Sequence, residues 1–451
     1  MSYIIVGAGP AGLSLAYSLA INSIPITIIE NSDQLGGSWN SQWIDNKYFS
    51  ENSPRVIVHN DNMNSLLHHI GMDDSDFTNI YGDSFATNIK MLSFLKRHFH
   101  LKDYIIFGAA FIKYRSIKVN ETVQNWMDKS SLSTSGKKAI TIISILLCDR
   151  PENTNVCDLF GMFGLSPVPL RQMIEPNKWH ELIQYYIGYM PHVQIIKNSK
   201  VIKIIKNYKA TSVDGVIVRD NKSHHQNTIY ADKVVLCTQS NGIVPILENS
   251  DIDIKNNWYP FRYMKVWGEN TFYCGFGFQL NFIEEVTMPS EWCWSCTGDW
   301  TVIILPISRW LKSFSNDPDI KTVWSCCIVD MDTRSTYLNK TANECTDQQE
   351  VVNECIRQIN EQGNIKINPA VVTTSVGLHR INSRWISKNT GYTQSKYGNL
   401  NMKGKMQNLF ALGCFTDTGT ASVATMGKAI DATAHYLSYY ETNLQKKVFS
   451  L

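Results

Sequence analysis

The chain has 451 residues, of which 18% are charged, and a formal net charge of +2 at pH 7. Because it contains no long basic run, this balance indicates neither nucleic acid nor an anionic membrane as a partner. Its 11 cysteines are scattered along the chain, which fits reduced thiols better than a disulfide framework. No apolar stretch reaches the ~18 residues that span a bilayer, and the N-terminus lacks the features of a signal peptide. We therefore expect a cytoplasmic protein without a transmembrane segment.

The first elements form a strand, a glycine-rich turn and a helix. Tyr3–Val6 is an apolar run typical of a buried strand, and G-x-G-x-x-G follows at Gly7, Gly9 and Gly12 before a helix over Leu13–Ala20. The three glycines permit a tight turn, close approach of the backbone to a pyrophosphate, and close packing of helix on strand. The N-terminus of the helix offers N–H groups to an anion. The pattern predicts a dinucleotide-binding turn.

The next strand ends in an acid and leads to a second glycine pair. Glu30 closes the strand Ile26–Ile29, where its carboxylate can accept hydrogen bonds from ribose hydroxyls and disfavours a 2′-phosphate. Gly36-Gly37-Ser38-Trp39 begins six residues later. This spacing resembles the E-x(5)-G-G element of FAD-containing enzymes of the glutathione-reductase and amine-oxidase superfamilies. The resemblance implies that the bound dinucleotide is FAD.

Two later segments resemble further parts of such an FAD domain. Val201–Val218 alternates like a hairpin, and Tyr230–Thr238 resembles the A-D-x-V-V-x-A-T strand of these flavoproteins. The strand Asn408–Gly413 with the helix Ala421–Tyr440 resembles their C-terminal element. Cys414 stands where that element usually has an acid, and Asp417 is near enough to replace it.

The order of these motifs resembles the flavin amine oxidases, phytoene desaturases and protoporphyrinogen oxidases. The resemblance implies an α/β fold with a Rossmann-like FAD-binding domain, built from residues 1–70, 190–245 and 400–440. A discontinuous α+β substrate domain would comprise residues 71–189, largely helical, and 246–399, with strands and a helix over 347–362. The residues that the resemblance assigns to FAD are Gly7, Gly9, Pro10, Ala11, Gly12, Glu30, Asn31, Gly36, Gly37, Ser38, Trp39, Val201, Gly413, Asp417, Ala424 and Thr425.

Candidates for catalysis are few. Lys265 lies roughly where amine oxidases keep a lysine near flavin N5, although it also fits an exposed strand lysine. His59 and Arg55 follow the glycine pair at a distance that could bring them over the flavin, or they are surface residues. Cys293 and Cys296 form a C-x-x-C that suits a redox dithiol, but packing is the simpler interpretation, and one such pair is weak evidence for zinc.

Aromatic residues are concentrated in the proposed substrate domain. They could line a pocket for an apolar or cationic substrate, or they pack a core. The tryptophans concerned are Trp258, Trp267, Trp292, Trp294, Trp300, Trp310 and Trp324.

The leading hypothesis is an FAD-dependent oxidoreductase acting on a small molecule. It would move a hydride from a substrate C–H, amine or polyene-like, to flavin N5 and be reoxidised by oxygen or another acceptor.

One alternative is an NAD(P)H-dependent flavin monooxygenase, because Gly36–Trp39 resembles that family's G-G-x-W. Such enzymes need a second G-x-G-x-x-G, and Gly161 and Gly164 lack its spacing. A non-catalytic FAD-bound structural or regulatory protein remains a further alternative, because of Cys414 and the missing catalytic constellation. A UDP-galactopyranose mutase fits less well, since its G-G-N is G-G-S here.

Overall fold

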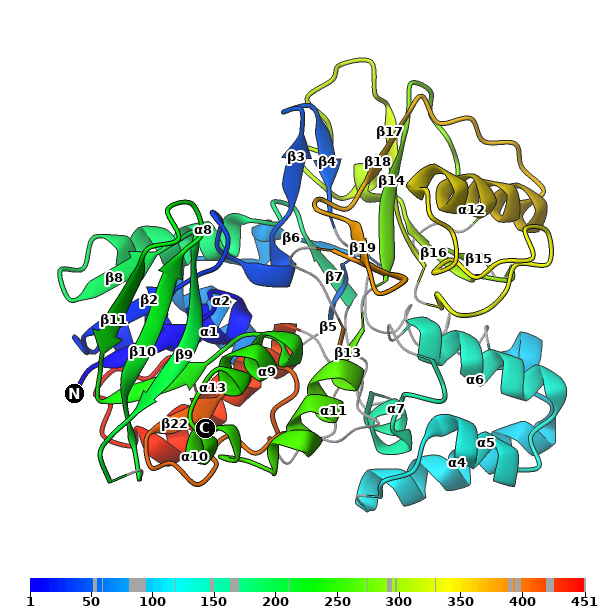
Figure 1. Ribbon diagram of the computed structural model, residues 1–451. Coiled ribbons are helices and arrows are strands. Elements are labelled where there is room, and N and C mark those ends of the chain that lie inside the picture. Colours follow the sequence, from blue (N-terminus) through cyan, green and yellow to red (C-terminus); the bar gives the residue numbers. More distant parts are fainter. Residues whose placement is uncertain are drawn as a thin grey trace.

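The computed structural model describes most of the chain (Figure 1). The described residues are 1–51, 55–58, 60–80, 95–117, 119–146, 150–162, 170–209, 211–273, 275–289, 294–296, 298–328, 330–387, 392–393, 399–418 and 426–449.

A parallel sheet lies at the centre of the larger part of the molecule (Figure 1). Its strands are short apolar runs rich in isoleucine and valine, as expected where both faces of a parallel sheet are covered. In spatial order they are β22 (Leu409–Ala411), β12 (Lys233–Leu236), β1 (Tyr3–Val6), β2 (Ile26–Ile29) and β8 (Val193–Ile196).

Alternate residues of β1 enter two different cores. Tyr3 and Ile5 pack with one set of helices, α1 (Pro10–Ala20), α2 (Asp61–His69), α8 (Lys178–Gly188) and α13 (Met426–Tyr440). Ile4 and Val6 pack toward the antiparallel sheet β9 (Ser199–Lys206), β10 (Val213–Asp220) and β11 (Gln226–Tyr230), together with α9 (Ser240–Glu248), α10 (Ile252–Lys255) and α11 (Phe261–Thr271). The parallel sheet is therefore covered on both faces, and its strand ends are where a ligand can approach.

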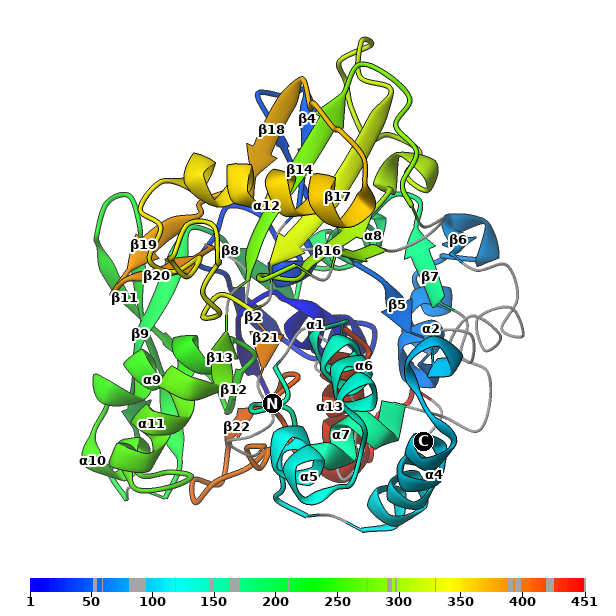
Figure 2. The ribbon, with the colours of Figure 1, turned by 90° about the vertical axis from the view of Figure 1, so that its right-hand side faces the viewer.

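A second, antiparallel sheet stands apart from the first, at the top of Figures 1 and 2. Its strands in spatial order are β15 (Trp294–Cys296), β16 (Val302–Leu305), β17 (Thr322–Ile328), β14 (Phe276–Phe282) and β18 (Val371–Thr374). Helix α12 (Gln348–Gly363) packs on one face, where every second residue of β14 is apolar and buried. This alternation is the expected pattern for a sheet with two different faces.

Shorter elements connect these parts. Two hairpins are formed by β3 (Gln42–Ile44) with β4 (Tyr48–Ser50) and by β19 (His379–Ile381) with β20 (Arg384–Ile386). Small pairings join β5 (Ile57–Val58), β6 (Phe77–Asn79) and β7 (Leu170–Met173), and β13 (Phe272–Tyr273) with β21 (Tyr392–Thr393). Single 3₁₀ turns are η1 (Gly37–Trp39), η2 (Asp74–Asp76) and η3 (Ile307–Arg309).

Four helices form a separate lobe at the lower right of Figure 1. They are α4 (Leu101–Ser116), α5 (Val123–Lys129), α6 (Thr134–Leu146) and α7 (Val156–Met162), and they share one apolar core. Among the helices of the described residues, none is both long and apolar enough to cross a bilayer.

The fold class expected from the sequence is confirmed: a Rossmann-like parallel sheet is joined to a part that contains an antiparallel sheet and helices. The predicted hairpin is β9–β10, and the predicted helix over 347–362 is α12. The strand expected around Lys265 is wrong, since this segment is helix α11. Its buried residues, Met264 and Trp267, are spaced as on one side of a helix.

Candidate functional site

A pocket of about 450 Å³ lies at the carboxyl ends of β1, β2, β12 and β22. Its volume falls in the range of small-molecule sites, and the ends of parallel strands are where open α/β sheets bind ligands. The lining residues are Val6, Gly7, Gly9, Ala11, Ile29, Glu30, Asn31, Gly37, Ser38, Ser199, Lys200, Val201, Cys237, Thr238, Gln239, Asn241, Gly242, Ile246, His379, Ile381, Ile386, Ser387, Gly413, Cys414, Phe415 and Ala429.

The glycine-rich turn between β1 and α1 forms one wall. Gly7 has φ +100°, which favours glycine, and a Cβ there would lie 2.9 Å from the carbonyl oxygen of Cys237. A Cβ on Gly12 would lie 2.0 Å from the Gly7 carbonyl oxygen, so α1 could not pack against the turn. A Cβ on Gly9 would meet nothing nearer than 3.9 Å. The protein itself therefore does not require glycine at position 9, and the space beside it belongs to the pocket.

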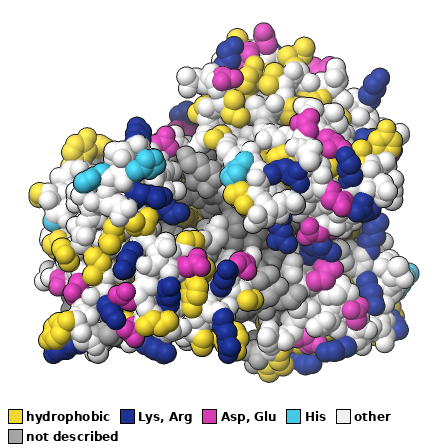
Figure 3. Space-filling model, in the orientation of Figure 1, with side chains coloured by type: hydrophobic (Ala, Val, Ile, Leu, Met, Phe, Trp, Pro, Cys, Tyr) yellow, Lys and Arg dark blue, Asp and Glu magenta, His cyan; other side chains and the backbone are white. Residues whose placement is uncertain are grey.

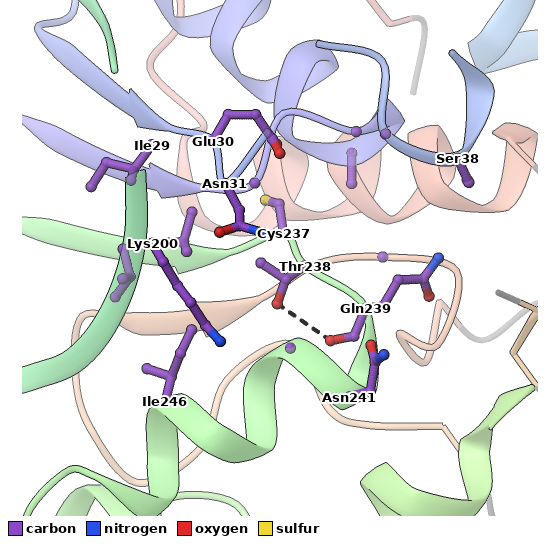
Figure 4. Close-up of a pocket in the computed structure, with 18 of the residues that line it drawn as sticks. Ile29, Glu30, Asn31, Ser38, Lys200, Cys237, Thr238, Gln239, Asn241 and Ile246 are labelled. Atoms are coloured by element: carbon purple, nitrogen blue, oxygen red, sulfur yellow. Dashed lines mark hydrogen bonds between the residues drawn. The ribbon is translucent and has the colours of Figure 1, made fainter. Parts of the chain in front are cut away.

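Glu30 occupies the end of β2 at the edge of this wall (Figure 4). Its Oε2 accepts the Ala8 N–H at 2.7 Å, and its Oε1 accepts the N–H and the hydroxyl of Ser32, both at 2.9 Å. The carboxylate is thus fixed by three donors while it remains part of the pocket lining. Glu30 thus stabilises the glycine-rich turn through the Ala8 N–H and presents an acceptor to the pocket.

The second glycine pair is held directly against the first turn. The Gly36 N–H donates to the carbonyl of Ala8 at 2.9 Å, and a Cβ on Gly37 would lie 2.9 Å from the Gly9 Cα. Both Gly36 and Gly37 have positive φ, at +102° and +57°. The two glycine motifs, more than twenty residues apart in the chain, therefore form one continuous backbone surface.

The remaining walls combine segments that the sequence assigned to FAD, at Val201 and Gly413, with segments that it did not identify as a site. Residues 237–242 follow β12 directly and run into the first turn of α9, and Figure 4 shows Thr238, Gln239 and Asn241 at the N-terminal end of that helix. Lys200 extends from β9 toward Ile246 of α9. The hairpin β19–β20 adds side chains from the chain that follows the antiparallel sheet. No local motif marks that hairpin, whereas the loop after β12 could have been found because it follows a recognisable strand.

A buried polar cluster lies beside the turn at Gly36. We call it the Arg55 cluster, and it comprises Asn40, Glu51, Arg55 and His180. Nη2 of Arg55 donates to the carbonyl of Asn40 at 2.7 Å, and Nε lies 3.4 Å from Oε2 of Glu51. Burial raises the pKa of Glu51, which Arg55 partly offsets. Burial, with the charges of Arg55 and Lys197, lowers the pKa of His180 to about 3.

His180 explains the glycine at position 36. A Cβ on Gly36 would lie 2.6 Å from Cδ2 of His180, and φ at Gly36 is +102°. The His180 side chain is only 5% exposed. Its neutral ring lies under the turn that joins the two glycine motifs. Neither His180 nor Glu51 was singled out from the sequence. Arg55 was considered, but its interpretation as a surface residue is wrong because it is buried.

The pocket contains many of the residues that the sequence assigned to FAD, but not all of them. Those in its lining are Gly7, Gly9, Ala11, Glu30, Asn31, Gly37, Ser38, Val201 and Gly413. Those outside its lining are Pro10, Gly12, Gly36, Trp39 and Asp417, of which Gly12 and Gly36 shape the turns from behind. Ala424 and Thr425 lie outside the described residues.

The candidate catalytic residues are placed less favourably. Lys265 is exposed on α11 and does not line the pocket. His59 and Cys293 lie outside the described residues. Cys296 is fully buried, its sulfur lies 3.4 Å from the carbonyl of Gln358, and burial raises the pKa of its thiol to about 12. A thiol with so high a pKa is a poor nucleophile at neutral pH.

The tryptophans of the proposed substrate domain pack cores. Trp258 and Trp267 belong to the core between the parallel sheet and α9–α11, and Trp300 and Trp324 to the core under α12. Trp294 packs against that second core, Trp310 belongs to a third, and Trp292 lies outside the described residues. The packing interpretation is therefore confirmed for the described tryptophans.

Comparison with protein families supports the dinucleotide-binding geometry. The family of NAD(P)-binding Rossmann-like domains matches residues 5–70, which contain both glycine motifs and Glu30. No curated protein sequence matches the chain.

Solved structures resemble the whole chain. An oxidoreductase from Methanosarcina mazei superposes with a TM-score of 0.63 at 12% identity and covers 96% of this chain and 99% of its own. Cyclohexylamine oxidase from Brevibacterium oxydans gives 0.59 at 12% identity, over 98% and 99%. A putrescine oxidase bound to putrescine gives 0.61 at 12% identity, over 97% and 99%. The chain has the fold of amine-oxidase-type oxidoreductases, as its motif order indicated.

Proposed function

We propose that this chain is an FAD-dependent oxidoreductase that oxidises a small molecule. The observation that carries the proposal is the joint wall formed by the two glycine motifs, with Glu30 at its edge. A pocket with an open position at Gly9 and an acceptor at Glu30 suits a diphosphate and a ribose. The likeness to amine-oxidase-type structures along the whole chain agrees with this assignment.

The residues of the pocket fit FAD at its nucleotide end. The first N–H groups of α1, which have no partner within the helix, suit the pyrophosphate. Glu30 suits the ribose, and Val201 and Lys200 extend the wall beyond it. When bound, FAD supplies an acceptor for a hydride from a substrate C–H. The role of the chain is to hold and orient both partners and to exclude water, which accounts for much of the rate in such reactions.

Replacing Glu30 with glutamine should weaken FAD binding by about 10- to 150-fold, because a charged hydrogen bond contributes roughly 1.5–3 kcal/mol. The amide also cannot accept two N–H donors as well as the carboxylate does. Titration of the apoprotein with FAD measures the effect. Asp33→Asn, an exposed acid outside the pocket lining, is the matched control. A purified protein that contains no flavin and takes up none would refute the FAD assignment itself.

The monooxygenase alternative predicts that NADPH reduces the bound flavin rapidly, whereas the oxidoreductase proposed here does not need this reaction. Gly161 and Gly164 lack the spacing of a second dinucleotide turn, so we expect NADPH to reduce the bound flavin only slowly. Anaerobic mixing followed by flavin absorbance measures this, with dithionite as the positive control. Rapid bleaching by NADPH would favour the monooxygenase over the oxidase.

A further inference from the structure

Helix α4 carries an apolar stripe that faces solvent. Leu101, Ile105 and Ile112 are 80%, 67% and 72% exposed, and Ala109 between them is exposed as well. Their spacing places them along one side of the helix. The opposite side, including Ala110 and Tyr114, is buried in the core of the helical lobe. Helix α4 is thus apolar on both its inner and its outer side.

The segment around α4 also carries an excess of positive charge. Residues 96–118 contain six basic residues and a single acid, Asp103. Asp103 is fully buried, where it accepts the Ser133 N–H at 2.7 Å and the His100 N–H at 2.9 Å. The only negative side chain therefore contributes to the interior of the lobe, while Lys102 and Lys113 beside the stripe are exposed. Figure 3 shows Lys and Arg side chains along the lower right edge, over this lobe.

We propose that α4 docks the protein on an anionic membrane surface. A basic helix with exposed aliphatic residues suits a bilayer interface, where the apolar side enters the headgroup region and the lysines meet acidic lipids. At 16 residues α4 is about 24 Å long, too short to span the hydrocarbon core of roughly 30 Å. The helix lies at the outer edge of the molecule in both ribbon views, so a flat surface can reach it (Figures 1 and 2).

Charge complementarity favours a membrane over a second copy of the chain. In a two-fold dimer through α4, the lysines of one copy would face those of the other, because such an interface joins identical surfaces. The net charge of +2 averages this basic segment with acidic regions elsewhere, so the composition of the whole chain does not record the basic surface at α4.

Sedimentation with vesicles tests the proposal. The purified protein should bind vesicles of phosphatidylcholine with phosphatidylglycerol more tightly than vesicles of phosphatidylcholine alone, and less tightly at high salt. The triple variant Leu101→Asn, Ile105→Asn, Ile112→Asn should lower partitioning by about a hundredfold or more, since each buried aliphatic side chain is worth roughly tenfold. Each of Lys102→Gln and Lys113→Gln should lower it by about fivefold.

Matched controls separate this site from general stickiness. Ile252→Asn and Ile283→Asn remove isoleucines that are 64% and 62% exposed on other elements, and they should leave vesicle binding unchanged. All variants are compared at equal flavin content and melting temperature. Absence of binding by the unmodified protein, or binding that survives the triple substitution, would overturn the proposal. A dimer in analytical ultracentrifugation that the triple variant loses would assign α4 to self-association instead.

Discussion

Replacing Gly9 with valine should weaken FAD binding at least about a hundredfold and leave the fold intact. The backbone at Gly9 is extended, with φ −80° and ψ −172°, so a side chain adds no strain there. Its Cβ would contact nothing nearer than 3.9 Å, and the methyl groups would enter the pocket. Overpacking costs roughly 1–3 kcal/mol, and a displaced phosphate loses charged hydrogen bonds of similar size. We expect affinity to fall at least about a hundredfold, measured by FAD titration.

The neighbouring glycine provides the contrast. Gly12→Val should fail to fold or lose several kcal/mol of stability, because its Cβ would lie 2.0 Å from the Gly7 carbonyl oxygen, a backbone atom that cannot move aside. Circular dichroism and urea unfolding distinguish the two variants. Gly188→Val, where nothing lies within 4 Å of the new Cβ, controls for the substitution itself. A Gly9→Val protein that binds FAD normally would show that the diphosphate does not lie at this turn.

The second large effect concerns His180 and acid stability. In the folded chain its pKa is lowered to about 3, chiefly by burial, whereas its ordinary value is 6.5. Between these values the unfolded chain binds a proton that the folded chain does not, so stability is complete above pH 6.5 and is lost as the pH falls. The loss from about pH 7 to about pH 5 is on the order of 2 kcal/mol.

His180→Gln should remove this part of the acid sensitivity. The difference in urea midpoint between about pH 7 and about pH 5 should shrink in the variant, by an amount equivalent to roughly 2 kcal/mol. Arg55 and Lys197, the charges that face the ring, remain in place, so the comparison isolates the imidazole. His68→Gln, an exposed histidine in the last turn of α2, should change nothing. An unchanged pH dependence in His180→Gln would mean that the ring is accessible to protons in the folded protein.

The start of the chain was predictable because its structure is determined locally. Gly7 and Gly12 lie in one short turn, where a Cβ on Gly12 would clash with the Gly7 carbonyl oxygen, and Glu30 follows a strand whose isoleucines are visible in the sequence. The same holds for the β9–β10 hairpin, whose alternating valines face a core. Such elements need no knowledge of distant residues.

The Arg55 cluster and the rest of the pocket depend on contacts that no local pattern records. His180 lies under Gly36 although more than a hundred residues separate them, and the hairpin β19–β20 reaches the pocket from beyond the antiparallel sheet. The segment around Lys265 was predicted as a strand for a related reason. It is short, and its helical spacing becomes clear only once Met264 and Trp267 are known to be buried. The basic surface of α4 could not be predicted from the sequence either, because it depends on the burial of Asp103.

The pocket is assembled from segments spread over the chain, from Val6 to Ala429, and includes the β19–β20 hairpin that follows the second sheet. A molecule that fills it touches all of them at once and stabilises only the assembled form, by an amount that grows with its free concentration. Under the proposed function, the supply of FAD in the cell would therefore set how often these segments separate. Riboflavin scarcity would then shorten the lifetime of the protein before it limits turnover.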